Sequence, residues 1–157
     1  MSKAIYKMAD LFAGCGGLSL GLEQAGFTSW FVNEIVPDYC NTYKYNHKLS
    51  DSHYFIGDIN ELNKNLDKYD FFIKGLDLVC GGPPCQGFSM ANRQRIIDDP
   101  RNQLYKAYLT FLSYVKPKFF IMENVRGMAN KYPEIMDNFK EYLGEGYKFD
   151  YRLLHAQ

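Results

Sequence analysis

Cys85 directly follows a Gly-Gly-Pro-Pro turn in the run LDLVCGGPPCQGFS. Two successive prolines fix φ and remove backbone donors, so this turn is stiff. Nucleophilic attack needs a reacting group held in alignment, which a stiff turn favours. A buried structural thiol is the ordinary role of a free cysteine and suits Cys15, Cys40 and Cys80 better. We therefore predict that Cys85 is a catalytic nucleophile.

Glu123 ends the apolar run FFIMENV, followed by Asn124. At the end of a central strand its carboxyl group would be partly desolvated, which favours the protonated form and suits proton donation. We expect Glu123 and Cys85 to face one crevice from adjacent strand ends. A metal site is not expected, because Cys80 and Cys85 are separated by both prolines and the three histidines form no paired motif.

The run DLFAGCGG places Gly14, Gly16 and Gly17 between an expected strand and an expected helix. Such a turn brings backbone N–H groups under a ligand and indicates a nucleotide-type site. Ser19 stands where the dinucleotide fingerprint has its third glycine, which disfavours a nicotinamide cofactor. A tight turn without a ligand remains an alternative at this stage.

Two acids follow the next expected strands, Glu34 in FVNEI and Asp58 in FIGDI. Carboxyl ends of parallel strands line the ligand crevice of an open α/β sheet. Glu34 suits a ribose diol, and Asp58 suits an exocyclic amine such as that of adenine. Each acid could instead cap the helix after it, but the pair together favours ligand contact.

These residues need an α/β scaffold, which alternating β-rich and helical patterns predict. We expect a doubly wound, mostly parallel sheet with helices on both faces. The expected strands are Tyr6–Phe12, Thr28–Asn33, Tyr54–Ile56, Asp77–Cys80, Phe119–Glu123 and Phe149–His155, and the expected helices are Leu18–Ala25, Pro37–Tyr45, Gln103–Val115 and Glu134–Leu143. Residues 86–102 lack apolar periodicity, and a connection of that length predicts a lid.

The bulk composition indicates one domain over residues 1–157, with 46% hydrophobic residues. The chain has 18 Lys and Arg residues and 18 Asp and Glu residues, so it has no net positive charge with which to bind a phosphate backbone. No signal-peptide core or membrane-length apolar run occurs, so we expect a cytoplasmic protein with no membrane association.

DLFAGCGG, the Glu34 and Asp58 strand ends, GGPPCQGFS, RNQLY and ENV occur in the order typical of one enzyme family. In these motifs the chain resembles the DNA (cytosine-5)-methyltransferases, from about Met8 to about His155. The resemblance implies a Rossmann-like fold that binds S-adenosyl-L-methionine, with double-stranded DNA as substrate and a bacterial or phage origin. It implies Cys85 and Glu123 as the catalytic pair acting on a flipped cytosine.

The same resemblance implies roles for two further sets of residues. The cofactor set is Phe12, Gly14, Gly16, Glu34, Ile35, Asp58, Ile59 and Leu104. The substrate set is Pro84, Gln86, Ser89, Arg93, Arg95 and Asn124, most of them in the expected lid, where ordinary solvated charge is an equal alternative for the arginines.

The chain departs from the family in length. Members continue after the sixth strand with a Gln-x-Arg-x-Arg segment, a target-recognition region and a seventh strand that inserts between the fifth and sixth. We therefore expect a second polypeptide to carry these parts. Two other functions stay open: an inactive cofactor-binding fragment that acts in assembly, and a related tRNA cytosine-5 methyltransferase, although Gln86–Ser89 is more similar to the DNA branch.

Overall fold

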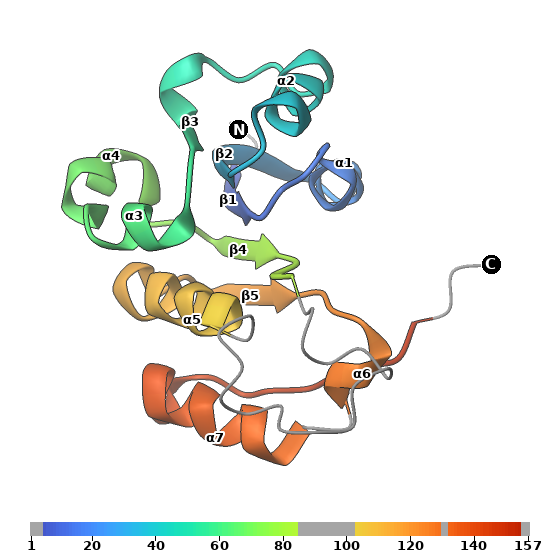
Figure 1. The fold of residues 1–157 in the computed structure, drawn as a ribbon, viewed down its shortest axis with the longest axis vertical. Helices are drawn as coiled ribbons and strands as arrows, with labels where there is room; N and C mark the ends of the chain where they lie inside the picture. The colour runs from blue at the N-terminus through green and yellow to red at the C-terminus, as the bar shows by residue number, and fades with distance from the viewer. Residues whose placement is uncertain (1–4, 85–102, 130–131, 155–157) are drawn as a thin grey trace.

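A five-stranded parallel sheet forms the centre of the molecule (Figure 1), in a computed structural model that describes residues 5–84, 103–129 and 132–154. The strand order is β3-β2-β1-β4-β5, and every neighbouring pair is parallel. The strands are β1 Tyr6–Leu11, β2 Phe27–Glu34, β3 Tyr54–Ile56, β4 Leu78–Gly81 and β5 Phe119–Met122. The order reverses between β1 and β4, and such a reversal creates the ligand crevice of doubly wound sheets.

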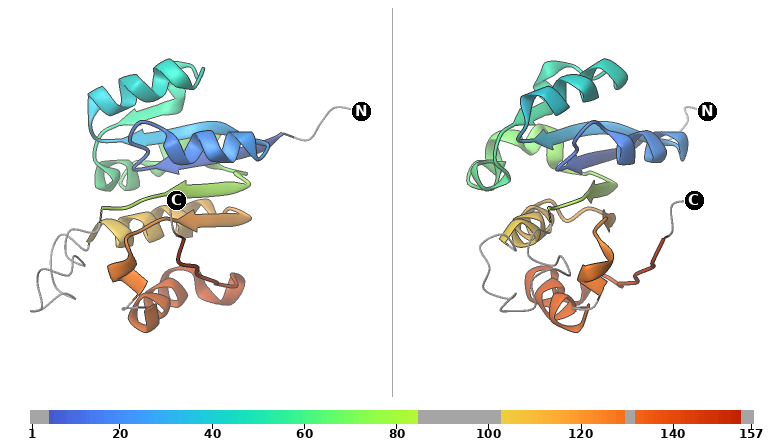
Figure 2. Two further views of the ribbon diagram at one scale, coloured as in Figure 1. Left: turned by 90° about the vertical axis from the view of Figure 1, so that its right-hand side faces the viewer. Right: turned by 45° about the vertical axis from the view of Figure 1, so that its right-hand side comes forward.

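Helices cover both faces of the sheet, as expected. In Figures 1 and 2, α1 lies on one side of the strands and α3, α4 and α5 lie on the other. The α-helices are α1 Gly17–Gln24, α2 Pro37–Asn46, α3 Ile59–Asn63, α4 Asp70–Ile73, α5 Gln103–Val115, α6 Arg126–Ala129 and α7 Tyr132–Leu143, and the 3-10 helices are η1 Asp51–His53, η2 Leu66–Tyr69 and η4 Gly144–Gly146.

Alternation along β2 divides the core between the two faces. Phe31 belongs to the larger cluster, which includes the buried face of α5, whereas Val32 belongs to a smaller cluster with Cys40, Tyr43 and Tyr54. Successive strand side chains point to opposite faces, so one strand serves both cores. The smaller cluster takes Cys40 and Tyr43 from α2, and Ala13 of the glycine loop packs against it.

Tyr108 joins α5 to the neighbouring strands β4 and β5. Its side chain is fully buried, and its hydroxyl group lies 3.1 Å from the carbonyl oxygen of Val79 and 3.0 Å from that of Ile121. Burial raises the pKa of Tyr108 well above its ordinary value, so the hydroxyl group keeps its proton and remains a donor. The tyrosine therefore holds β4 and β5 in fixed relation.

Three short helices, α3, α4 and α6, were not expected from the sequence. Each contains four or five residues, which is too few to show an apolar period of 3.6 residues. The other four helices and the first five strands occur within about two residues of the expected bounds, an ordinary margin for helix and strand ends.

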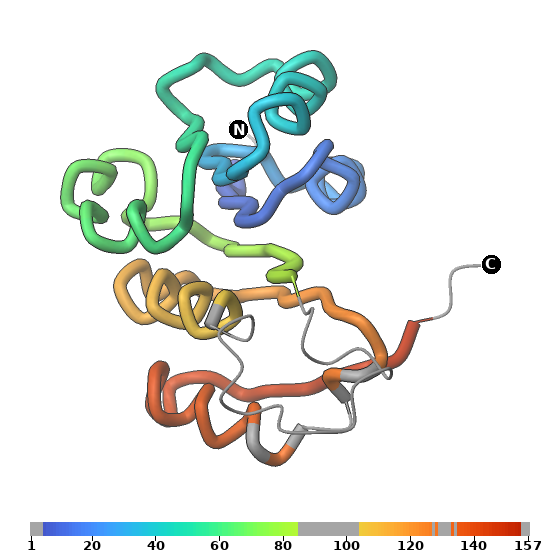
Figure 3. Tube along the Cα trace, viewed as in Figure 1, coloured from blue at the N-terminus to red at the C-terminus, as the bar shows by residue number. Residues whose placement is uncertain are grey.

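The expected strand Phe149–His155 is wrong over its described part, because residues 147–154 form neither strand nor helix. Phe149 packs between Phe120 of β5, at 5.9 Å, and Phe139 of α7, at 5.4 Å between ring centroids. Figure 3 traces this segment from the end of α7 toward the C-terminus. A strand needs backbone partners on a neighbour, and within the described sheet this segment has none.

Candidate active site

The carboxylate of Glu34 clamps the glycine loop at the end of β1. Its Oε2 accepts a hydrogen bond of 2.7 Å from the backbone N–H of Gly14, and its Oε1 accepts one of 2.8 Å from that of Val36. The residue is 6% exposed. Two charge-assisted bonds from different elements fix both the loop and the start of α2. Glu34 is the last residue of β2, so its carboxylate lies at the carboxyl end of the sheet, beside the glycine loop.

Phe12 and Gly16 show why this loop has an unusual course. Phe12 adopts a φ of 57° and Gly16 a φ of 90°, both in the left-handed region. That conformation is uncommon for a residue other than glycine and costs energy that the surroundings must compensate. The ring of Phe12 packs partly buried against the larger core cluster. Such strain is a common feature of ligand-binding loops.

Asp58 caps α3, which was the alternative to ligand contact. Its Oδ1 accepts a hydrogen bond of 2.7 Å from the backbone N–H of Asn60, and the side chain is exposed. Oδ2 remains for another donor. The neighbouring Ile59 is 2% exposed and belongs to the core, whereas Ile35 is 59% exposed beside Glu34. Ile35 therefore presents its apolar surface to solvent at the strand ends, and Ile59 acts first as a packing residue.

Asn33 is a positioning residue that the sequence analysis did not identify. Its side-chain amide donates to the carbonyl oxygens of Phe55, at 3.1 Å, and Gly57, at 2.9 Å. The residue is 2% exposed. These bonds tie the end of β2 to the turn that carries Asp58. In the sequence, its place directly before Glu34 was the signal for this role.

The ends of β4 and β5 come together at the Gly-Gly-Pro-Pro turn. The side-chain amide of Asn124 donates to the carbonyl oxygen of Pro83 at 2.9 Å, and the backbone N–H of Glu123 donates to that of Gly81 at 2.9 Å. A Cβ added to Gly82 would lie 3.0 Å from Oε2 of Glu123. The Glu123 carboxylate therefore lies against the turn that leads to Cys85.

The expected desolvation of Glu123 is wrong for the described residues, since this residue is exposed. The strand ends at Met122, so the carboxyl group lies just beyond the sheet rather than within it. Pro84 is exposed and Leu104 is half-buried against the core. Five predicted site residues lie outside the described residues: Cys85, Gln86, Ser89, Arg93 and Arg95.

Two of the cysteines expected to be structural are buried, Cys40 and Cys80. Burial raises the pKa of both thiols, so they stay protonated and unreactive. The third, Cys15, is exposed in the glycine loop, so the expectation of a buried role is wrong there. In the described parts of the chain, no helix has the length and apolarity needed to span a bilayer, and no cluster of His, Cys, Asp and Glu has the makings of a metal site.

The sheet order, the clamped glycine loop and the joined ends of β4 and β5 define a Rossmann-like methyltransferase fold. A crystal structure from E. coli, described as a DNA modification methyltransferase encoded within a prophage, supports this class with a TM-score of 0.74 at 36% identity. That match covers 92% of this chain and 39% of the other.

The sequence model of the family described as "C-5 cytosine-specific DNA methylase" matches residues 6–157. The chain belongs to this family. It is 40% identical over 153 residues to the Type II methyltransferase M.FnuDI of Fusobacterium nucleatum and 38% identical over 154 residues to M1.HphI of Haemophilus parahaemolyticus. These matches cover 96% and 94% of this chain but only 42% and 40% of those relatives.

A shorter relative also matches along the same part of the chain. M.AquIA of Picosynechococcus is 36% identical over 162 residues, and the match covers 96% of this chain and 64% of that protein. The chain therefore spans about two fifths of the first two relatives and a larger share of the third.

Proposed function

We propose that this chain supplies the cofactor-binding and catalytic part of a bacterial or phage DNA (cytosine-5)-methyltransferase that acts in the cytoplasm. The observation that carries the proposal is the meeting of two motif turns at one edge of the sheet: the loop clamped by Glu34 after β1, and the Pro-Pro turn bonded to Asn124 after β4. The first suits a nucleoside, and the second directly precedes Cys85, the proposed nucleophile, in the sequence.

The residues around β1 and β2 fit S-adenosyl-L-methionine. Each carboxylate oxygen of Glu34 already accepts one backbone N–H and has lone-pair capacity left for a ribose hydroxyl group. The exposed side chain of Ile35 offers an apolar surface for adenine, and the free Oδ2 of Asp58 suits its exocyclic amine. The complete proposed set is Phe12, Gly14, Gly16, Glu34, Ile35, Asp58, Ile59 and Leu104.

The catalytic pair acts on a cytosine flipped out of the DNA helix. The Cys85 thiolate adds to ring carbon-6 and forms an S–C bond, while Glu123 hydrogen-bonds the ring nitrogen and the exocyclic amine, where charge changes during the addition. S-Adenosyl-L-methionine supplies an electrophilic methyl group for carbon-5. Loss of the carbon-5 proton then restores the ring double bond and expels the Cys85 thiolate.

The loop after the catalytic cysteine faces the substrate in this proposal. Pro84 and Asn124 shape the turn beside the cytosine, since Asn124 bonds to the Pro83 carbonyl group. Contacts to phosphates or to the groove come from the predicted lid. The proposed lid contacts are Gln86, Ser89, Arg93 and Arg95.

A complementary polypeptide completes the enzyme in this proposal. β5 is the edge strand of the described sheet, and its side chains Phe119 and Ile121 are 66% and 41% exposed. Three more apolar side chains are exposed just after Phe149 in the sequence: Tyr151, Leu153 and Leu154. An open edge with apolar side chains favours addition of another strand.

Isothermal titration calorimetry with S-adenosyl-L-methionine and with its demethylated product tests the cofactor site. We expect measurable binding of both ligands to the folded chain, with weakened affinity in a Glu34→Gln variant. Glu61→Gln is the matched control, because the Glu61 side chain is exposed on α3 and its carboxylate bonds to Lys64 at the surface. Absence of heat with either ligand at about millimolar concentration would contradict the proposal. A dissociation constant of about 1 mM corresponds to a binding free energy of roughly −4 kcal/mol.

A further inference from the structure

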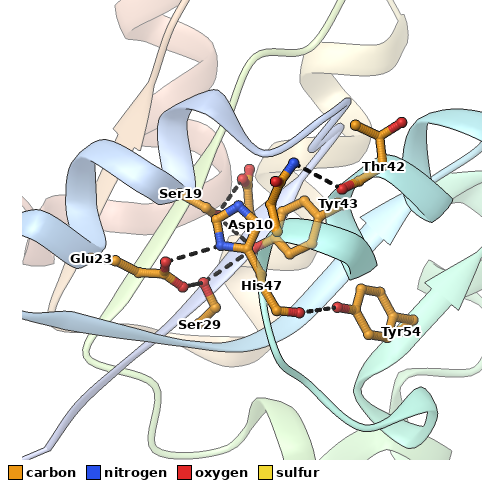
Figure 4. Close-up of polar contacts among 9 residues, drawn as sticks. Asp10, Ser19, Glu23, Ser29, Thr42, Tyr43, His47 and Tyr54 are labelled. Atoms are coloured by element: carbon orange, nitrogen blue, oxygen red, sulfur yellow. Dashed lines mark hydrogen bonds and ion pairs between the residues drawn. The ribbon is translucent and has the colours of Figure 1, made fainter.

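A buried polar cluster lies beneath the glycine loop and serves no step of the proposed reaction (Figure 4). It joins side chains from β1, α1, β2 and α2. Its members, called the sub-loop cluster below, are Asp10, Ser19, Glu23, Ser29, Tyr43 and His47. All but Glu23 are less than 5% exposed. Burying so many polar groups is costly unless each one is bonded.

The hydrogen bonds of the sub-loop cluster run outward from Tyr43. Its hydroxyl hydrogen is shared between the hydroxyl oxygens of Ser19, at 2.8 Å, and Ser29, at 3.1 Å. Ser19 donates its own hydrogen to Asp10 at 2.6 Å, and Ser29 donates to Glu23 at 2.6 Å. Each serine therefore links the Tyr43 hydroxyl group to a carboxylate. Burial raises the pKa of Tyr43, which keeps its hydroxyl group protonated.

His47 completes the sub-loop cluster at the end of α2. Its Nδ1 lies 3.0 Å from Oε2 of Glu23, and the carboxylate acceptor assigns the proton to Nδ1. The imidazole ring stacks on Tyr43, with 4.1 Å between centroids and 30° between planes. The opposite edge of the ring, which carries Nε2, has no hydrogen bond with any described residue. That edge faces the glycine loop.

Gly16 rests directly on this pair of rings. A Cβ built on Gly16 would lie 2.4 Å from Nε2 of His47 and 2.8 Å from Cδ2 of Tyr43. Any side chain here would displace the rings or the loop, so the contact with the Gly16 backbone is as close as glycine allows. Gly14 is held from the other side by Glu34. The loop is therefore fixed at two points, one by a carboxylate and one by aromatic rings.

We propose that His47 is a positioning residue for the cofactor site, and that its Nε2 edge fixes the position of the glycine loop by its contact with Gly16. This inference rests on the proposed function, in which that loop binds S-adenosyl-L-methionine. The Nδ1 bond to Glu23 orients the imidazole ring, and the Nε2 edge supports the loop. These two tasks belong to different atoms of one side chain and can be separated by substitution.

Three substitutions separate the two tasks. His47→Asn keeps a donor near the Nδ1 position but leaves the space beneath Gly16 empty, His47→Gln carries an amide to the Nε2 position but loses the Glu23 bond, and His47→Ala removes both. His53→Asn is the matched control, because His53 precedes β3 at the opposite end of the strand from the site and bonds to the carbonyl oxygen of Trp30. Affinity for S-adenosyl-L-methionine and thermal unfolding are measured for each variant.

We expect His47→Ala and His47→Asn to weaken cofactor binding by about tenfold or more, while His47→Gln stays within about threefold of the wild type. Thermal stability should follow a different order, with His47→Asn closer to the wild type because it retains a partner for Glu23. His53→Asn should leave the affinity unchanged. Affinity that simply follows thermal stability across the series, or a His47→Ala variant that binds like the wild type, would overturn the proposal.

Amide hydrogen exchange in the chain without cofactor gives an independent readout. The Gly16 N–H donates to the Ala13 carbonyl oxygen at 3.0 Å, so its protection reports the closure of the loop. We expect His47→Ala and His47→Asn to accelerate exchange at Gly16, with His47→Gln close to the wild type. If the wild-type chain binds no cofactor, the proposed function fails, and the exchange rates still decide whether His47 holds the loop. Equal exchange at Gly16 in all variants contradicts a positioning role.

Discussion

The side-chain amide of Asn124 donates a 2.9 Å hydrogen bond to the carbonyl oxygen of Pro83, two residues before Cys85. This bond links the turn after β5 to the turn after β4, and proline at position 83 leaves the carbonyl oxygen as the only backbone polar group there. The side-chain Oδ1 of Asn124 accepts a hydrogen bond of 2.8 Å from the backbone N–H of Val125, which holds the side-chain amide in one orientation. The turn after β5, which carries Glu123, is thus joined to the Gly-Gly-Pro-Pro turn that precedes Cys85 in the sequence.

Asn124→Ala should slow methyl transfer by the complete enzyme by about tenfold to a hundredfold, because a small displacement of a nucleophile is costly. Cofactor affinity should remain close to that of the wild type, since the glycine loop does not depend on this bond. Single-turnover kinetics with DNA and calorimetry with S-adenosyl-L-methionine measure the two effects. Asn46→Ala is the control, because Asn46 is exposed on α2 and bonds to the Thr42 carbonyl oxygen. A normal rate in Asn124→Ala would show that the junction does not position the nucleophile.

Cys85→Ser should abolish methylation and leave cofactor binding nearly unchanged, since the hydroxyl group is a far weaker nucleophile than a thiolate. DNA that contains 5-fluorocytosine should trap a covalent adduct with the wild-type enzyme and its complementary polypeptide. Cys40→Ser serves as a control for cysteine replacement away from the strand ends, with stability measured because Cys40 is buried. Equal adduct yield from Cys85→Ser would exclude Cys85 as the nucleophile.

Glu34→Gln should weaken cofactor binding by about tenfold or more and lower the free energy of unfolding by about 1–3 kcal/mol. The amide nitrogen of glutamine would face one of the two backbone N–H donors, Gly14 or Val36, so that one donor is left unpaired. Calorimetry and urea unfolding measure the two quantities. Wild-type affinity in this variant would remove Glu34 from the cofactor site.

The carboxyl group of Asp10 should make stability depend on pH in an unusual direction. Burial raises its pKa from 3.8 to about 6, partly opposed by hydrogen bonds from Ser19 and Cys80. Because the folded-state pKa is the higher one, the stability that this group contributes is fully present below about pH 4 and is lost as the pH rises through about 6. The loss amounts to roughly 3 kcal/mol at neutral pH.

Asp10→Asn removes this titration and keeps an acceptor for Ser19. We expect the variant to be more stable than the wild type at about pH 7.5 and of similar stability near pH 4, measured by urea unfolding at both values. Asp137→Asn, at an exposed site on α7, should show no such difference between the two pH values. A variant that is destabilised more at pH 7.5 than at pH 4 would contradict the assigned direction.

The chain alone should not methylate DNA. Its formal net charge is zero, whereas specific DNA binding draws on several phosphate contacts. β5 also presents Phe119 and Ile121 at an open sheet edge that a further strand would cover. A methyl-transfer assay on mixed-sequence duplex DNA tests this expectation. Repeated turnover at carbon-5 of cytosine with no second polypeptide would show that the chain is sufficient.

Sequence patterns were enough to predict the doubly wound sheet, the glycine loop and the acids at the strand ends. Apolar strand runs, prolines in the first turn of a helix and glycines at helix ends are local signals. They can be recognised without knowledge of the tertiary structure. The expected strand Phe149–His155, which is wrong over residues 149–154, shows the limit of such signals. Its alternating pattern was genuine, but a strand also needs a neighbour, and pairing partners are not encoded within the segment itself.

The sequence by itself determined which side chains meet at the carboxyl edge of the sheet, because a parallel strand order brings all strand ends to one side. Only the tertiary structure decided how they meet: Asp58 capping α3, Glu123 exposed beyond β5, Asn124 bonded to Pro83, and His47 beneath Gly16. These contacts join residues up to 41 positions apart and depend on distances of a few tenths of an ångström, which arise from packing and are invisible to residue type and spacing.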